Sequence, residues 1–473
     1  MFFFDRQSEM ARLKRLEGRQ EGGLVVVWGR RRVGKTRLLL EWERTHNGLY
    51  LAGDQSSAPL QRTYIAEAIQ ERFPGFAAVE YPTWESLLSR LAREAQAAGW
   101  KGPLIVDELP YFVATSPELP SLLQRWVDHD VRQAGLIVAF SGSSQRMMQG
   151  LVLNHSAPLY GRAQELLNLQ PIGAKYLHEA FPGTSFSGLI ELYSILGGIP
   201  RYWELAHDYG VEDLNLLVDR MILDPRAPLF NEPDRLLHEE IPSAISLRPL
   251  LDSIGMGAHK PSEIAARTGM PATSLSKPLS RLREMNLVSR DISFGESEKS
   301  SKRALYKIQD PFMRLWFRVV APHRSLLMES PQATRQALFQ KFRSTLVAQS
   351  WEELCRRCIP SLPVNGPKED TNPWLPARRY WRGNEPEWDI VAESLDKKRI
   401  LLGECKWVEQ ELNERDIERV ARQVLQKGLP SSIQFEKREV TYVLFIGKVR
   451  KGCKREIPGM RILDAADVIH HSA

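Results

Sequence analysis

The strongest constraint on the fold of this 473-residue chain is one short segment near its start. Residues 29–36 read Gly-Arg-Arg-Arg-Val-Gly-Lys-Thr, which fits the pattern G-x-x-x-x-G-K-[ST] of a P-loop. The apolar run 24–28 comes directly before this segment, and a helix is expected directly after it at 36–42. Because a P-loop needs a strand before it and a helix after it, the sequence predicts a phosphate-binding loop in an α/β fold.

The residue types in this loop suit a nucleoside triphosphate, for which ATP is the expected ligand. Glycines let backbone N–H groups turn towards phosphate oxygens, and the following helix presents its positive end to the same anion. Lys35 is expected to reach the β- and γ-phosphates, and Thr36 is expected to bind Mg²⁺. The predicted nucleotide-binding residues of this segment are Gly29, Arg30, Arg31, Arg32, Val33, Gly34, Lys35, Thr36 and Arg37. For the three consecutive arginines two interpretations stay open: added charge near phosphate, or a solvated loop tip.

A second apolar run, residues 104–106, is followed by two carboxylates, Asp107 and Glu108. The carboxyl ends of parallel strands meet at one edge of a sheet, so both acids are expected beside the P-loop. Asp107 is predicted to hold Mg²⁺ through water, and Glu108 is predicted to polarise the attacking water. Taken without the P-loop, the same motif would indicate only a capped strand end.

A third apolar run, residues 136–140, is followed by Ser141 and Ser143. In ATPases with such an acidic pair, a polar residue on the adjoining strand senses the γ-phosphate. Either serine could do this, and Ser143 is the one included in the predicted site. Arg162 follows this strand and is a catalytic candidate, because an arginine there could reach a γ-phosphate within the chain or across a subunit interface. A structural role for Arg162 is equally open.

The middle of the chain has the pattern of a helix-turn-helix unit. Residues 261–269 predict a short helix that ends in a glycine turn, residues 272–284 predict a second helix, and two strand-like runs follow. This order is typical of a winged helix. Lys277 and Arg281 could contact phosphates with the second helix in a major groove. The alternative is a packing module within the signalling body of an ATPase.

The last part of the chain is expected to form a helix at 342–357, three strands, a helix at 413–427 and a strand at 440–446. Together with the sequence Glu404-Cys-Lys406, this order resembles the PD-(D/E)xK core of restriction-endonuclease-like proteins. An E-x-K triplet also occurs on strands that simply turn charged residues outward. The Glu387/Asp389 pair just upstream favours the nuclease-like interpretation.

The chemistry of this C-terminal motif follows from its spacing. Glu404 and Lys406 are two residues apart on one strand and therefore share a face, while Asp389 is expected on the neighbouring strand. Asp389 and Glu404 could jointly bind Mg²⁺, and Lys406 could orient or deprotonate the attacking water. Trp388 stands where the resembling motif has proline, which puts the catalytic role in doubt. Further candidates for this site are Glu352, Glu353 and Gln423.

The order of motifs along the chain resembles the archaeal/bacterial AAA-type ATPase family related to the STAND NTPases, with a DUF234-type C-terminal region. The segments that carry this resemblance are 4–9, 29–36, 106–108, 142–143, 159–162, 196–202 and 306–317. The resemblance implies that the turn at 197–200 lies in a helical lid over the nucleotide. We predict an α/β protein with a P-loop AAA+ type ATPase core at 1–172, a helical lid at 173–242, a winged-helix domain at 243–310, a helical linker at 311–345 and a restriction-endonuclease-like α/β domain at 346–473.

The composition bears on three further properties: zinc binding, nucleic-acid binding and insertion into a membrane. The chain has only four cysteines, and Cys355 and Cys358 have zinc-ligand spacing without a second pair, so a buried helix is favoured over a zinc site. The formal net charge of +6 permits nucleic-acid binding without requiring it. No stretch approaches the ~20 apolar residues of a membrane span, and no secretory leader is visible, so a cytoplasmic protein without a membrane partner is expected.

These observations lead to one functional hypothesis and its alternatives. We expect an ATPase that uses ATP and Mg²⁺ as a switch for a DNA-binding, Mg²⁺-dependent deoxyribonuclease domain, assembled as a homo-oligomer. The first alternative is a signalling or scaffold ATPase whose C-terminal domain binds DNA without cleaving it. The second alternative is a regulatory ATPase that recognises a protein partner.

Overall fold

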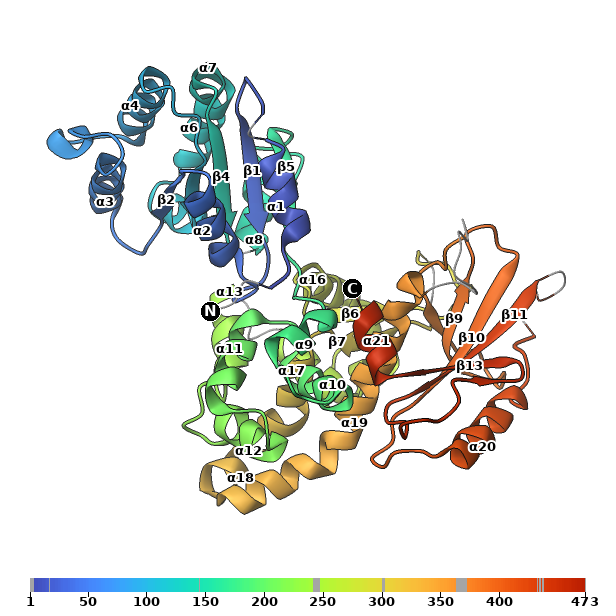
Figure 1. Cartoon of the computed structure of the whole chain (residues 1–473). Helices are drawn as coiled ribbons and strands as arrows, with labels where there is room; N and C mark the ends of the chain where they lie inside the picture. Colours follow the sequence, from blue (N-terminus) through green and yellow to red (C-terminus); the bar gives the residue numbers. More distant parts are fainter. Residues whose placement is uncertain are drawn as a thin grey trace. The chain divides into compact units, whose positions relative to one another are not determined.

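The computed structural model of the protein describes residues 4–16, 18–143, 145–240, 247–299, 303–362, 372–431, 433, 435 and 438–472. These residues form two compact units. The N-terminal unit comprises the described residues up to 172 together with 199–201, and the C-terminal unit comprises 173–198 and the described residues from 202 onwards. Figure 1 traces both units along the sequence.

The N-terminal unit is built on a five-stranded parallel sheet with the order β2-β3-β4-β1-β5. Its strands are β1 (Gly23–Trp28), β2 (Leu49–Ala52), β3 (Leu104–Asp107), β4 (Ile137–Gly142) and β5 (Ala163–Asn168). The apolar runs of the sequence predict β1, β3 and β4. They miss β2, which has only four residues, and β5, an edge strand whose side chains alternate between exposed and covered. Since β4 lies between β1 and β3, its end stands between the P-loop and the acidic pair.

Helices cover both faces of this sheet (Figure 1). They are α1 (Gln7–Lys14), α2 (Lys35–Thr45), α3 (Ala58–Gln70), α4 (Trp84–Ala97), α5 (Leu109–Thr115) and α6 (Leu119–Trp126). Val25 and Val27 of β1 pack with side chains of α1 and α2, whereas Leu24 and Val26 pack with side chains of α3 to α6. The continuous apolar run of β1 is therefore explained by burial on both faces.

The C-terminal unit starts with helices in the stretch predicted as a lid. These helices are α9 (Leu177–Ala180), α10 (Phe186–Leu196), α11 (Pro200–Tyr209), α12 (Leu214–Val218) and α13 (Glu232–Glu240). The winged-helix pattern follows as α14 (Arg248–Gly255), α15 (Pro261–Thr268), α16 (Ser276–Glu284), β6 (Val288–Asp291) and β7 (Leu305–Ile308). The two strands pair antiparallel, as a wing requires. The second helix begins at Ser276 rather than at residue 272, because residues 272–274 form a 3₁₀ turn.

A long helix and a second sheet complete this unit. The elements are α17 (Pro311–Leu315), α18 (Arg324–Glu329), α19 (Gln332–Cys358), β8 (Arg378–Tyr380), β9 (Trp388–Glu393), β10 (Arg399–Lys406), α20 (Glu414–Leu425), β11 (Glu439–Ile446), β12 (Glu456–Ile457), β13 (Met460–Asp464) and α21 (Ala465–His471). The strand order is β12-β13-β11-β10-β9-β8, with β10 parallel to β11 and antiparallel to β9. The predicted order of helix, three strands, helix and strand is therefore present. The helix expected at 342–357 begins earlier, at Gln332, because Leu338 and Phe339 are also buried and continue its apolar face.

The two cysteines with zinc-like spacing lie inside α19. Cys355 and Cys358 are both fully buried, and burial raises the pKa of each thiol. The buried-helix interpretation of these residues is thus confirmed. Among the described residues, every helix is too short or too polar to span a membrane.

Candidate functional site

The loop between β1 and α2 has the backbone that a phosphate cradle needs. Gly29 and Gly34 have φ angles of 150° and 98°, which favour glycine. A Cβ atom at Gly29 would lie 2.6 Å from the Leu169 carbonyl oxygen, so no other residue fits there. The buried Lys35 ammonium donates to the carbonyl oxygens of Gly29 at 2.9 Å and Arg30 at 3.2 Å. Lys35 therefore contacts the backbone of its own loop.

Arg6 supports this loop from the N-terminal segment. Its guanidinium is almost fully buried and donates to the carbonyl oxygens of Val33 at 2.9 Å and Gln170 at 2.7 Å. Glu9 holds the same side chain through an ion pair of 3.0 Å. The sequence marked residues 4–9 only through a family resemblance, whereas the structure gives Arg6 a physical task, which is to fix the P-loop backbone.

The arginines of the loop occupy different environments. Arg30 is buried, Arg31 donates to the Tyr111 hydroxyl at 3.3 Å, and Arg32 is exposed with a φ of 65°. Arg37 is also exposed, in the first turn of α2. The solvated-tip interpretation therefore applies to Arg32 alone among the three consecutive arginines.

Asp107 is the centre of a hydroxyl network beside the loop. Its Oδ2 atom accepts from the Thr36 hydroxyl at 2.8 Å and from the Tyr50 hydroxyl at 2.7 Å, and its Oδ1 atom accepts from the Glu108 backbone N–H at 2.9 Å. Burial and the neighbouring Asp107 carboxylate raise the pKa of Tyr50. The sequence predicts Thr36 and Asp107 but misses Tyr50, because its strand β2 is too short to show a periodic pattern.

Glu108 is held by the strand that carries the serines. Its backbone is left-handed, with φ 52° and ψ 42°, a strained conformation that is often found at functional positions. Its carboxylate accepts from the Ser143 hydroxyl and, at 3.2 Å, from the Ser143 backbone N–H. Ser141 is fully buried, and its hydroxyl has no hydrogen-bond partner among the described residues. The structure thus brings Ser143, rather than Ser141, to the acidic pair.

Arg162 is engaged away from this network in the present conformation. Its guanidinium forms a two-pronged ion pair with Asp128, with N–O distances of 2.9 Å, and donates to the Pro158 carbonyl at 3.0 Å. These contacts agree with a structural role for Arg162, the alternative that the sequence left open. A role for Arg162 in hydrolysis stays a prediction.

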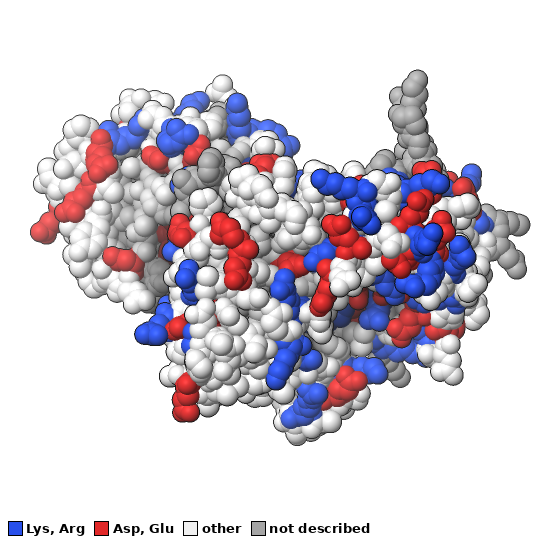
Figure 2. Space-filling view, turned by 60° about the horizontal axis from the view of Figure 1, so that its bottom comes forward, with Lys and Arg blue, Asp and Glu red and all other residues white. Residues whose placement is uncertain are grey.

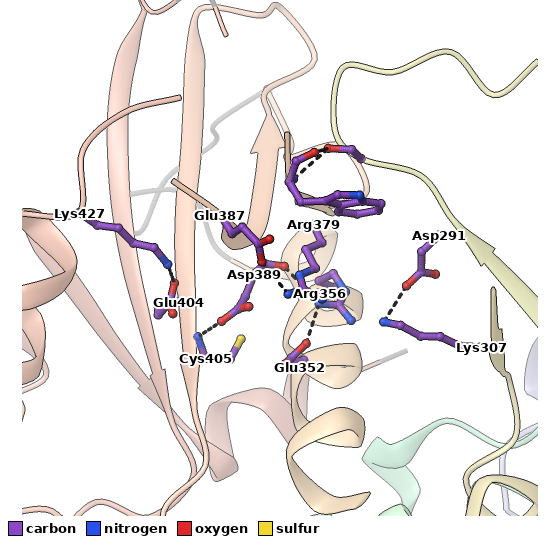
Figure 3. Close-up of polar contacts among 12 residues, drawn as sticks. Asp291, Lys307, Glu352, Arg356, Arg379, Glu387, Asp389, Glu404, Cys405 and Lys427 are labelled. Carbon is purple, nitrogen blue, oxygen red and sulfur yellow. Dashed lines mark hydrogen bonds and ion pairs between the residues drawn. The ribbon is translucent and has the colours of Figure 1, made fainter. Parts of the chain in front are cut away.

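The second candidate site lies where β9 and β10 pair in the C-terminal unit (Figure 3). Gly403 faces Ile390 in the antiparallel register, so Glu404 and Asp389 follow on adjacent strands. The Asp389 carboxylate accepts from the Cys405 backbone N–H at 3.0 Å. The Arg356 guanidinium of α19 donates to the Asp389 carbonyl at 3.1 Å. The predicted neighbourhood of Asp389, Glu404 and Lys406 is therefore present in the fold.

Two lysines contact Glu404. Its Oε1 atom accepts from the Lys406 ammonium at 3.0 Å, and its Oε2 atom accepts from the Lys427 ammonium at 2.5 Å. The Lys427 ammonium also lies 5.1 Å from the centre of the Trp388 ring, within cation–π range. Gln423, the accessory group suggested by the sequence, is exposed on α20. Lys427 follows that helix and reaches the site instead.

The structure distinguishes the two glutamates of α19. Burial raises the pKa of Glu352, and the nearby Asp389 carboxylate raises it further. Glu353 instead forms an ion pair of 2.7 Å with Arg314. Glu352 forms an ion pair of 3.6 Å with Arg356, which also donates to the Asp389 carbonyl, so Glu352 is the glutamate linked to Asp389 (Figure 3).

Each candidate site offers oxygen atoms that could bind Mg²⁺. Among the described residues, no three or more His, Cys, Asp or Glu side chains are grouped to hold a metal ion. Mg²⁺ is commonly held by one or two carboxylates, with water and substrate phosphate as the other ligands. Thr36 with Asp107, and Asp389 with Glu404, supply such hard oxygen ligands. The residues suit a hydrated Mg²⁺, provided that a lysine leaves Glu404.

Two parts of the chain match known protein families. Residues 3–205 match the family described as an ATPase domain predominantly from Archaea. The N-terminal part of the chain is thus similar to this archaeal ATPase family. Residues 316–420 match DUF234, a family described as archaeal and bacterial proteins of unknown function. Both parts of the resemblance seen in the motif order are thereby confirmed.

One of the similar proteins extends over nearly the whole chain. A protein of Methanocaldococcus jannaschii described as uncharacterised is 27% identical over 454 residues, which is 94% of this chain and 95% of that protein. The structure of a Walker-type ATPase of Pyrococcus abyssi superposes with a TM-score of 0.53 at 20% identity. That match covers 67% of this chain and 96% of the other, and it shows a shared fold.

Proposed function

We propose that this protein is an ATP-hydrolysing switch that controls a DNA-directed, Mg²⁺-dependent nuclease domain. The observation that carries the ATPase part of the proposal is the network around the P-loop. The Thr36 hydroxyl is already bonded to Asp107, and Glu108 is bonded to Ser143. A loop for phosphate, ligands for Mg²⁺ and a carboxylate for water are thus grouped at one sheet edge.

The contacts of the N-terminal unit suggest how hydrolysis is controlled. Lys35 would exchange the carbonyl oxygens of Gly29 and Arg30 for phosphate oxygens when ATP binds. Glu108 would have to leave the Ser143 hydroxyl before it could accept a proton from water. Bound Mg²⁺ would neutralise charge on the phosphates. Release of Glu108 from Ser143 is therefore the gate between ATP binding and hydrolysis.

Two substitutions test the ATPase part. Lys35→Ala is expected to abolish ATP binding, because the loop loses its only buried ammonium among the described residues. Glu108→Gln is expected to bind ATP but hydrolyse it slowly. Lys14→Ala, an exposed lysine of the same unit, is the matched control. ATP turnover by Glu108→Gln at the wild-type rate would remove Glu108 from its proposed role.

The DNA-directed part rests on the C-terminal unit. On the face drawn in Figure 2, Lys and Arg side chains are interspersed with Asp and Glu. Helix α16 offers Lys277 and Arg283 as exposed cations, and Arg281 is half-buried. These side chains lie on the helix that a winged helix inserts into a major groove. They support DNA as the partner of this unit.

The strand pair β9–β10 supplies the proposed cleavage site. Asp389 and Glu404 would hold Mg²⁺, which would stabilise the charge that develops on the scissile phosphate. Lys406 would leave Glu404 to orient the attacking water, and Lys427 would remain as the second cation near Glu404. Glu352, with its raised pKa, is suited to accept a hydrogen bond from that water or to carry a proton.

The cleavage proposal is tested by incubating linear and plasmid DNA with Mg²⁺. The wild type is expected to cut, while Asp389→Ala and Lys406→Ala are expected not to. Glu409→Ala and Lys397→Ala change exposed residues of the same unit and should cut normally. Identical products from all variants would show a contaminating nuclease and would remove the claim.

A second function is favoured by one observation. Both carboxylate oxygens of Glu404 accept from lysines, so Glu404 is neutralised by side chains rather than open to a metal ion. Such a domain could bind DNA phosphates without cleaving them. Salt-sensitive DNA binding by the wild type, without cleavage at any Mg²⁺ concentration, would select this function. DNA affinity that is absent even at low salt would instead favour a protein partner.

A further inference from the structure

A polar cavity lies between the winged-helix elements and α19 of the C-terminal unit. Its volume is about 220 Å³, whereas about 10–15 Å³ is enough for one water molecule. Basic side chains from β7, α17 and the turn that follows it line the cavity, namely Lys307, Arg314 and Arg318. No acidic residue is among its lining residues within the described chain. The cavity is therefore large and cationic, and its lining residues include none of the residues predicted for the two candidate sites.

The three cations differ in how far they are neutralised. Lys307 forms an ion pair of 2.9 Å with Asp291, and Arg314 forms one of 2.7 Å with Glu353. Arg318 has no acidic partner within 4.0 Å among the described residues. Its guanidinium makes only a long contact of 3.4 Å to the Gly255 carbonyl and lies 5.8 Å from the centre of the Phe342 ring. Arg318 is thus the cation whose charge is left for a ligand.

The backbone makes room for this arginine. Gly257 has a φ of 98°, and a Cβ atom there would lie 3.0 Å from an Arg318 nitrogen. Apolar and neutral side chains also line the cavity, among them Ile254, Phe342 and Thr345, and the Phe342 ring lies beside Arg318. A ligand would therefore meet the Arg318 charge and, next to it, an aromatic and aliphatic wall.

We propose that this cavity binds a small phosphorylated ligand, with its phosphate on Arg318 and its apolar or aromatic part against Phe342. A guanidinium binds phosphate oxygens through two parallel hydrogen bonds, which suits Arg318. This site goes beyond the ATPase and nuclease roles. Helix α19 links the cavity to the second candidate site, because α19 contributes Thr345 to the cavity and also carries Glu352 and Arg356, of which Arg356 contacts Asp389. A ligand in the cavity would thus contact the same helix that contacts Asp389 of the proposed cleavage site.

The test is calorimetric titration of the full chain, first saturated with ADP and Mg²⁺, with inorganic pyrophosphate and with AMP. The wild type is expected to bind one of these probes at an additional site. Arg318→Gln and Thr345→Trp are expected to bind it at least about tenfold more weakly, which is 1.4 kcal/mol. Arg318→Gln removes the charge, and Thr345→Trp fills the cavity with a larger side chain. Because Thr345 is exposed, Thr345→Trp should still fold even if Arg318→Gln does not. Arg226→Gln changes a highly exposed arginine of the same unit and should bind like the wild type.

Three results would overturn the proposal. The first is that the ADP-saturated wild type binds neither pyrophosphate nor AMP. The second is that Arg318→Gln and Thr345→Trp, with wild-type thermal stability, bind the probe as tightly as the wild type. The third is that short duplex DNA loses affinity in Arg318→Gln while the small probes do not bind at all, because the phosphate source would then be the DNA backbone.

Discussion

Substitution of Tyr50 by phenylalanine tests the Asp107 network with a minimal change. Phenylalanine keeps the ring that packs beside β3 and removes only the hydroxyl, which donates to Asp107 Oδ2 at 2.7 Å. Asp107 is almost fully buried and would retain Thr36 as its remaining hydroxyl donor. The substitution therefore removes one of two groups that orient the carboxylate expected to serve Mg²⁺.

The size of the effect follows from the hydrogen bond that this substitution removes. A hydrogen bond to a charged group contributes about 1.5–3 kcal/mol, and loss of a partner that orients a metal ligand typically costs about 10–100-fold in metal affinity. We therefore expect Tyr50→Phe to need about 10–100-fold more Mg²⁺ than the wild type for the same ATP affinity. Affinity for ATP without Mg²⁺ should change little, since the P-loop contacts remain.

The measurement is binding of a fluorescent ATP analogue over a series of Mg²⁺ concentrations. Tyr64→Phe is the matched control, because Tyr64 lies on α3 and its side chain is exposed. If Tyr50→Phe and Tyr64→Phe show the same Mg²⁺ dependence, the Tyr50 hydroxyl does not orient Asp107 and the reasoning is refuted.

Three further predictions concern other contacts. Arg6→Ala should weaken ATP binding and lower the free energy of unfolding by about 1–3 kcal/mol in urea titrations, because buried carbonyl oxygens lose their donor; unchanged ATP affinity would contradict its support of the P-loop. Lys427→Met removes a partly exposed ion pair worth about 1 kcal/mol, so Mn²⁺ should bind roughly fivefold more tightly in EPR titrations; weaker binding would show that Lys427 assists metal binding. Burial acts to raise the pKa of Glu353, but the charges of Arg314 and Arg357 outweigh burial and lower this pKa. The ionised Glu353 therefore stabilises the fold fully above the unfolded pKa of a glutamate, about 4.3, and this stabilisation is lost as the pH falls through the folded pKa. Glu353→Gln should cost about 3–5 kcal/mol at neutral pH and should lose less stability than the wild type on acidification, as measured by denaturant unfolding at each pH; equal acid sensitivity would contradict this assignment.

The P-loop and the acidic pair could be predicted because each consists of residues that are adjacent in the sequence. The P-loop, Asp107 and Glu108 follow buried strands, and continuous apolar runs reveal such strands directly. The order of elements in the C-terminal sheet was also predictable, because each segment has its own period. Strands β2 and β5 were missed because a short strand and a half-exposed edge strand lack a continuous apolar run.

The contacts that complete each site could not be predicted, because they join residues far apart in the chain. Arg6 meets Gln170, and Lys427 meets Glu404, without any spacing that signals either pair. The choice of Ser143 over Ser141 depends on which hydroxyl faces Glu108. Similarly, the orientation of α19 about its axis decides that Glu353 pairs with Arg314 while Glu352 faces the side of Asp389.

The most direct test of the account is whether ATP controls DNA cleavage. Cleavage of plasmid DNA should be measured with Mg²⁺ for the wild type, Lys35→Ala and Asp389→Ala, each with and without ATP. We predict that cleavage by the wild type changes with ATP, that Lys35→Ala gives one rate under both conditions, and that Asp389→Ala does not cleave. Cleavage that requires Asp389 but is equally fast with and without ATP would contradict the coupling of the two units.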